Sequence, residues 1–354
     1  MNNSTLKKTA NWFRCVGTLS ESSLKEEECN VKVKDKEGNV SNKKGKRIRG
    51  SISMETKNGT FTFNVYAQTP TSQGEKNNRW TMYESMLNWN PQIGGDNSLP
   101  VTKACVEGQV SINDYVSQQD GRVKTTLRWS VSKGTTKVKD DESGVTLEAT
   151  GFIQSVKPEV KNDEETGRLL VTLYGADNNG SCYPINCVVE EKLVDAFEEY
   201  YEVGETASFT LDRVMHHVGP QRKTVQRALG GYGSVNVNAG YDTEELVVVG
   251  ADEPIEEPDE LYTEDDEGNE IPVETDWINP ETMKKAIKIR NQMLKEMEEK
   301  GPVKKESVSN MLKKAKSVSK KSQSKFDDFD DFDEEETPFD AEVENDDEDF
   351  ESLY

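Results

Sequence analysis

The segment KRIRGSISMETKNGTFTFNVYAQ, residues 46–68, contains two runs in which apolar and polar side chains alternate. Alternation with period two is typical of a strand with one face on a core and the other in solvent. Between the runs stands Asn58-Gly59, a pair that accepts positive φ and closes tight hairpins. The segment therefore predicts an antiparallel hairpin. The side chains predicted to face the core are Ile48, Ile52, Met54, Phe61, Phe63 and Val65.

On either side of this hairpin, further segments read as strands. A short apolar-rich strand is predicted at residues 11–19, a short helix at 80–88, and two strands at 104–115 and 122–132. The order of the first half is thus three strands, a helix and two strands. The second half repeats this order. Its predicted elements are strands at 145–160, 168–175 and 182–189, a helix at 190–201, and strands at 206–214 and 244–249.

This repeated order resembles the OB-fold, a partly open five-stranded Greek-key barrel with a helix between its third and fourth strands. The resemblance implies a mainly β protein with two tandem five-stranded OB-like barrels, at residues 1–140 and 141–250. A β-sandwich with an incidental helix is the alternative fold.

The acidic charge of the chain belongs to its C-terminal part. Residues 1–250 carry a net charge of −3, and residues 251–354 carry −20 of the total of −23. A sequence pI near 4.7 would argue against a nucleic-acid partner if the charge were spread evenly. Because it is not, the body is judged without its C-terminal segment.

Several functional classes have little support in the sequence. No apolar run approaches the ~20 residues that span a bilayer, and the first ten residues lack a signal-peptide core. Five cysteines without a secretion signal predict reduced thiols in a cytoplasmic protein. Cys182 and Cys187 lack a second ligand pair, so buried thiols are favoured over zinc. No catalytic motif or cofactor-binding motif stands out, so we expect no enzyme activity and no cofactor.

The OB resemblance implies that single-stranded DNA would bind on strands two and three and on the adjoining loops. Such sites need cations for phosphates and aromatic rings for bases. The loop before strand two and the start of that strand hold five cations within residues 43–49. Charged surface strands without any ligand are the alternative. The candidates are Lys43, Lys44, Lys46, Arg47, Arg49 and Tyr66, with Trp12 and Arg14 on strand one and Lys124 and Arg128 on strand five.

In the second barrel, a long loop is predicted between strands four and five. It contains Arg222, Lys223 and Arg227, followed by a glycine-rich run around Tyr232. Glycines let a backbone approach a ligand closely, although such a run can equally be a plain flexible loop. These four residues complete the candidate nucleic-acid contacts.

The C-terminal part divides into an acidic linker at 251–278, a basic helical segment at 279–325 and a disordered acidic tail at 326–354. Acidic runs interrupted by Phe cannot form a core, but they offer apolar anchors to a partner. The tail resembles that of bacterial and phage single-stranded DNA-binding proteins, although here fifteen residues follow Pro338-Phe339. The partner-binding candidates are Phe326, Phe329, Phe332, Pro338, Phe339, Phe350 and Tyr354.

Together these features predict a single-stranded DNA-binding protein, encoded by a phage and acting in replication or recombination in the host cytoplasm. The resemblance implies that its tail recruits replication or recombination enzymes, and an oligomer is possible. Two alternatives remain open. One is an interaction protein whose tail mimics DNA and which binds no nucleic acid. The other is a module for duplex DNA or RNA.

Overall fold

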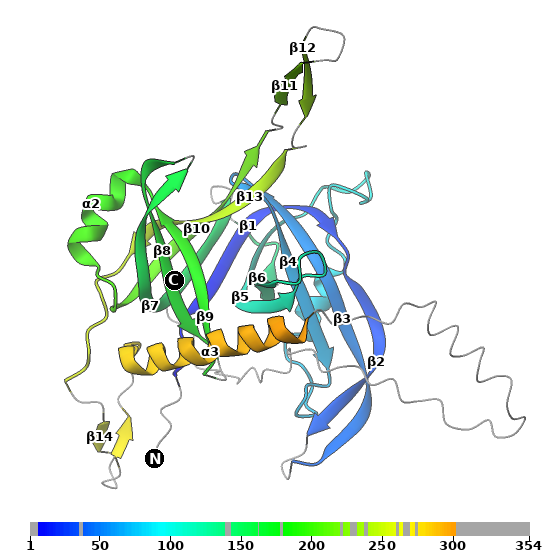
Figure 1. The fold of residues 1–354 in the computed structure, drawn as a ribbon. Coiled ribbons are helices and arrows are strands. Elements are labelled where there is room, and N and C mark those ends of the chain that lie inside the picture. Colours follow the sequence, from blue (N-terminus) through cyan, green and yellow to red (C-terminus); the bar gives the residue numbers. More distant parts are fainter. Residues whose placement is uncertain are drawn as a thin grey trace, which may run out of the picture. The chain divides into compact units, whose positions relative to one another are not determined.

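A computed structural model describes residues 6–34, 38–138, 143–161, 163–177, 180–219, 222–226, 232–236, 240–259, 262–264, 270–272 and 275–301. The described chain is mainly β, with one large mixed sheet and three helices, which is consistent with an OB-like fold (Figure 1). Among these residues, no helix has the length and apolarity needed to cross a bilayer.

Five strands of the N-terminal half pair in a closed ring, here called the N-terminal cycle. Its order is β1, β3, β4, β6, β5 and back to β1, because β1 pairs with both β3 and β5. The β4–β6 pairing is parallel, and β1–β3, β3–β4 and β1–β5 are antiparallel. The elements are β1 (Asn11–Ser22), β3 (Val40–Thr56), β4 (Gly59–Thr69), α1 (Trp80–Met86), β5 (Lys103–Val116) and β6 (Val123–Thr135).

The C-terminal half forms a second ring with the same order, here called the C-terminal cycle. It runs β7, β8, β9, β13, β10 and back to β7, and only its β9–β13 pairing is parallel. The elements are β7 (Gly144–Lys161), β8 (Glu164–Ala176), β9 (Cys182–Val189), α2 (Glu191–Tyr200), β10 (Thr206–Val218) and β13 (Tyr241–Ala251).

The two cycles are joined through their first strands. Residues 11–16 of β1 pair antiparallel with residues 144–149 of β7, which produces one continuous eleven-stranded sheet. The remaining parts of β1 and β7 pair with β3 and β8 of their own cycles. One apolar cluster includes buried residues of both cycles, among them Phe13, Phe63, Leu147 and Phe209. The alternation predicted for residues 46–68 is confirmed, because all six apolar side chains named there are buried.

The structure contains strands that the sequence did not predict. β2 (Lys25–Lys34) was not predicted, and residues 42–45, expected in a loop, belong to β3, where they pair with β2. The loop expected after β10 contains a hairpin of β11 (Arg222–Gln226) and β12 (Tyr232–Asn236) (Figure 1). The acidic segment 251–278 contains a second hairpin, of β14 (Tyr262–Glu264) and β15 (Glu270–Pro272). β2 carries charged side chains at an edge of the large sheet, and the strands of the two hairpins are only three to five residues long, so none of them shows the apolar alternation by which strands are recognised.

The predicted helix after residue 279 is confirmed as α3 (Pro280–Lys300). Asn279 accepts a hydrogen bond from the amide of Thr282 at 3.0 Å, which caps the helix start. Met283 is fully buried in a second apolar cluster with Phe152, Cys182 and Ile278. The first turns of α3 therefore pack on the outer side of β7 and β9. Residues 302–354, with the acidic tail, lie outside the described residues.

Candidate nucleic-acid interface

The outer side of β3 and β4 carries polar side chains, because the apolar residues of both strands alternate with them and point inward. Arg49 lies directly opposite Tyr66, and Arg47 lies opposite Gln68. Tyr66 is 40% exposed. We call this surface the β3–β4 face. It consists of Arg47, Arg49, Ser51, Ser53, Thr62, Asn64, Tyr66 and Gln68.

A carboxylate from the unpredicted strand β2 lies between the two arginines of this face. Glu27 is 3.2 Å from Nε of Arg47 and 3.1 Å from Nε of Arg49. The hydrogen bond from Arg49, and then that from Arg47, holds the pKa of Glu27 below its ordinary value. Two cations and one anion leave this group with a net positive charge at neutral pH.

The pleat of β3 separates the five cations of residues 43–49 onto two sides. Lys43 lies on the same side as Arg47 and Arg49, with its ammonium near the turn at Gly74. Lys44 and Lys46 lie on the opposite side, and Lys46 binds Glu26 at 2.6 Å. The sequence cluster is therefore not one continuous basic patch.

Trp12 and Arg14 lie together on the outer side of β1, as predicted. The ammonium of Lys133 lies 5.3 Å from the centre of the Trp12 ring. Nε of Arg14 is 3.8 Å from Glu107 on the neighbouring strand β5, a long pair between partly exposed groups. Lys133 was not among the candidate contacts predicted from sequence, because its contact with the Trp12 ring depends on how the strands pair in the sheet.

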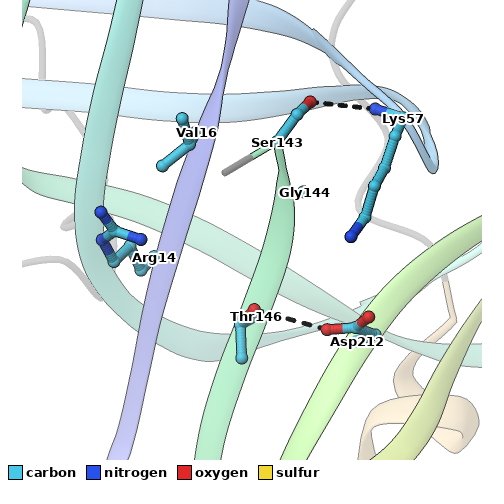
Figure 2. A pocket seen from close by; sticks show the side chains of 7 residues that line it. All are labelled: Arg14, Val16, Lys57, Ser143, Gly144, Thr146 and Asp212. Atoms are coloured by element: carbon cyan, nitrogen blue, oxygen red, sulfur yellow. Dashed lines mark hydrogen bonds between the residues drawn. The ribbon is translucent and has the colours of Figure 1, made fainter. Parts of the chain in front are cut away.

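Arg14 also lines a pocket of about 300 Å³ at the end of the β1–β7 seam (Figure 2). Lys57 comes from the turn between β3 and β4, and Asp212 from β10. The backbone amide of Met215 on β10 donates to the Asn58 carbonyl at 2.9 Å, which fixes this turn against β10. Lys57 precedes the predicted Asn58-Gly59 turn, and nothing in the sequence marks it as a pocket residue. The lining residues are Arg14, Val16, Lys57, Ser143, Gly144, Thr146 and Asp212.

The other candidates are spread along the chain. Lys124 and Arg128 lie on β6 as predicted, and Lys124 is 3.7 Å from Asp120 in its own hairpin. Trp129, next to Arg128 on the same strand, is buried. For Arg222, Lys223 and Tyr232 the structure defines only the backbone of β11 and β12. Arg227 and all seven partner-binding candidates of the tail lie outside the described residues.

The corresponding outer face of the C-terminal cycle, on β8 and β9, is partly covered by α3, and its arginine is paired with carboxylates. Tyr174 and Cys182 of this face are packed against Met283 and Ile287 of α3. At the far end of β8, Arg168 is 2.6 Å from Glu245 and 3.5 Å from Glu159. Its cation is therefore matched by carboxylates. Among the described residues, no three His, Cys, Asp or Glu side chains are grouped as metal ligands.

Two solved structures of the single-stranded DNA binding protein from Thermus aquaticus, the wild type and a deletion mutant, are similar to this chain at 11% sequence identity and a TM-score of 0.37. Each covers 72% of this chain, and the matches span 97% and 99% of those chains respectively. No curated protein matches the sequence. The model of the YorF family matches residues 24–300, which include most of both cycles and α3. The chain belongs to the YorF family.

Proposed function

We propose that this protein binds single-stranded DNA, with the β3–β4 face as its main contact surface, and that it is a binding protein and not an enzyme. The observation that carries this proposal is the register of β3 and β4. It places Arg47 and Arg49 on one exposed face with Tyr66. Phosphates need cations and unpaired bases need a stacking surface, and this face offers both within two strands.

We further infer that each cycle is an OB-like barrel. The ring order of strands one, two, three, five, four, with a parallel pair between the third and the fifth, supports this. The helix between the third and fourth strands supports it as well. In OB barrels, the outer face of strands two and three receives oligonucleotides. In the N-terminal cycle these strands are β3 and β4.

The two cycles would not contribute equally. On β8 and β9, α3 covers part of the matching face, and Arg168 is held by two carboxylates. A strand would therefore be held mainly by the N-terminal cycle. Binding through phosphates and stacking is weakly sequence-specific and strongly dependent on salt.

The acidic, aromatic-containing tail of the sequence supports a wider role. We propose that the protein coats single-stranded DNA during phage replication or recombination in the host cytoplasm. Its acidic tail, residues 326–354, would recruit partner enzymes through its aromatic residues. Deleting this tail should leave oligo(dT) binding intact or tighter. If neither form binds oligo(dT) at low salt, the proposed function is wrong.

The test of the face itself is a titration of fluorescent oligo(dT) at several salt concentrations, against a duplex of equal length. The double variant Arg47→Ala/Arg49→Ala should reduce the slope of log affinity against log salt by about 0.7 for each phosphate that the arginines neutralise in the wild type. The matched control is Lys284→Ala/Lys285→Ala on α3, which removes the same charge elsewhere. An equal slope in the wild type and the arginine variant would contradict the assignment of this face.

A further inference from the structure

The pocket at the end of the β1–β7 seam brings charged groups from three separate strands or turns together. Figure 2 shows Arg14 on one side and Lys57 and Asp212 on the other. Its volume of about 300 Å³ is at the small end of the range for ligand pockets. The neighbouring Gly144 has no side chain, and a Cβ there would come within 3.6 Å of the Lys57 side chain.

Two opposite charges of this pocket are not paired with each other. Among the described residues, neither Lys57 nor Asp212 takes part in an ion pair. Asp212 accepts a hydrogen bond from the Thr146 hydroxyl at 3.4 Å, and the backbone amide of Lys57 donates to Ser143 (Figure 2). A cation donor and a carboxylate acceptor thus line one small space without neutralising each other.

Guanine matches this arrangement of donor and acceptor. Its unpaired Watson–Crick edge presents O6 as an acceptor beside N1–H and the N2 amino group as two donors. An ammonium can donate to O6 while a carboxylate accepts from both nitrogen atoms. A guanidinium on the other side of the pocket suits the phosphate of the same nucleotide.

We propose that this pocket binds one guanine nucleotide. Lys57 and Asp212 would read the base edge, and Arg14 would hold the phosphate. The nucleotide belongs to a bound single strand, and in this form the inference rests on the proposed function. A free guanine nucleotide is the other source of the same chemistry, and the experiment separates the two.

The experiment uses the full chain and two kinds of probe. The first is a titration with dGMP, dIMP, dAMP and deoxyguanosine, followed by NMR. The second is fluorescence anisotropy of oligo(dT) that carries one central dG, against the same oligonucleotide with a central dI. Inosine keeps O6 and N1–H but lacks the N2 amino group. The variants are Lys57→Ala, Asp212→Asn and Arg14→Gln, and Lys192→Ala on α2 is the control.

The wild type should bind dGMP about tenfold more tightly than dIMP or dAMP, because each lacks part of the matching edge. Asp212→Asn should remove this preference, and Lys57→Ala should weaken dGMP binding by about tenfold. Arg14→Gln should make dGMP and deoxyguanosine bind alike. Lys192→Ala should behave as the wild type. Unchanged thermal unfolding of each variant excludes a general effect on folding.

The outcomes distinguish the pocket from the proposed function. Equal binding of the dG and dI strands, together with no dGMP binding, would overturn the pocket proposal. The proposed function would still be supported if Arg47→Ala/Arg49→Ala weakened strand binding. If dGMP binds and Lys57→Ala weakens it, but no oligonucleotide binds, the pocket holds a free nucleotide and the proposed function is wrong. A preference for dG strands that Asp212→Asn removes supports both.

Discussion

At the scale of single residues, Glu27 decides how much positive charge the β3–β4 face offers. It bonds both arginines of the face, so a bound phosphate has to compete with it. The carboxylate also holds two long side chains in place. A variant without the Glu27 charge distinguishes two roles of this carboxylate, which are competition with bound phosphates and positioning of the two arginines.

We expect Glu27→Gln to tighten oligo(dT) binding about fivefold at low salt, because the change removes a negative charge that repels the phosphates. The gain should shrink as salt rises. Anisotropy titrations at two salt concentrations measure it. Glu28→Gln, on the opposite side of β2, is the matched control. Weaker binding of the Glu27 variant would show that the carboxylate positions the arginines.

Arg213 of β10 is a buried cation that connects the two cycles. Its guanidinium lies 4.6 Å from the Phe61 ring centre and 4.4 Å from that of Trp129, both in the N-terminal cycle. It also binds Glu244 at 2.7 Å. Burial is the main reason why the pKa of Arg213 is lowered.

Replacing Arg213 with Ala should reduce the free energy of unfolding by about 2–5 kcal/mol, since it leaves a cavity beside Phe61 and Trp129. Arg213→Met fills most of the volume and leaves Glu244, which is about half exposed, in water. Arg213→Met should therefore lower the free energy of unfolding clearly less than Arg213→Ala. Urea denaturation of both variants measures the difference. Equal destabilisation by the two variants would mean that the ion pair, and not the packing, holds this region.

At the scale of elements, the sequence predicts strands well where one face is apolar. Residues 46–68 are such a case, and both strands and the turn were placed correctly. β2 was missed because six of its ten residues are Lys or Glu, and only Val31 and Val33 are buried. This omission also hid Glu26 and Glu27, so the number of free cations on β3 was overestimated from sequence. Cross-strand partners cannot be read from one strand alone.

The docking of α3 can be tested through Cys182, which the helix covers. This thiol is 2% exposed, and burial raises its pKa to about 11. Met283→Asp puts a charge into the apolar cluster, so the helix should detach and Cys182 should become reactive. Site-resolved mass spectrometry after iodoacetamide treatment should show faster alkylation of Cys182. Met293→Asp, at an exposed position of the same helix, should change nothing.

A network on β7, β8 and β13 predicts acid sensitivity. Burial raises the pKa of Glu245, but the hydrogen bond and charge of Arg168, with the charge of Lys161, outweigh it, so the net shift is downward. A carboxyl with a lowered folded-state pKa stabilises above its unfolded pKa and loses this contribution as pH falls. Stability should therefore fall as the pH drops through and below 4.5, the ordinary pKa of a glutamate. In urea denaturation, the free energy of unfolding of Glu245→Gln should decrease less on acidification than that of the wild type. The control variant Glu190→Gln should lose as much stability as the wild type.

At the scale of the whole molecule, the sequence predicted the repeated order of elements but not how the halves join. The order follows from local patterns, whereas the β1–β7 pairing links residues 128 to 138 positions apart. The pocket that contains Lys57 exists only because of this pairing. The uneven charge of the chain is visible in the sequence alone, and it removes the objection that the low pI raises against a nucleic-acid partner.

The shared seam of β1 and β7 also determines where the chain can be cut. A fragment starting at Ser143 would lack β1. The backbone amides and carbonyls of residues 144–149 that pair with β1 would then be exposed and could pair with another chain. We expect this fragment to self-associate in size-exclusion chromatography, and addition of the missing half in trans should reverse it. A monodisperse monomeric fragment would contradict this. Two halves with the same strand order need not be separable, because each supplies a strand neighbour that the other lacks.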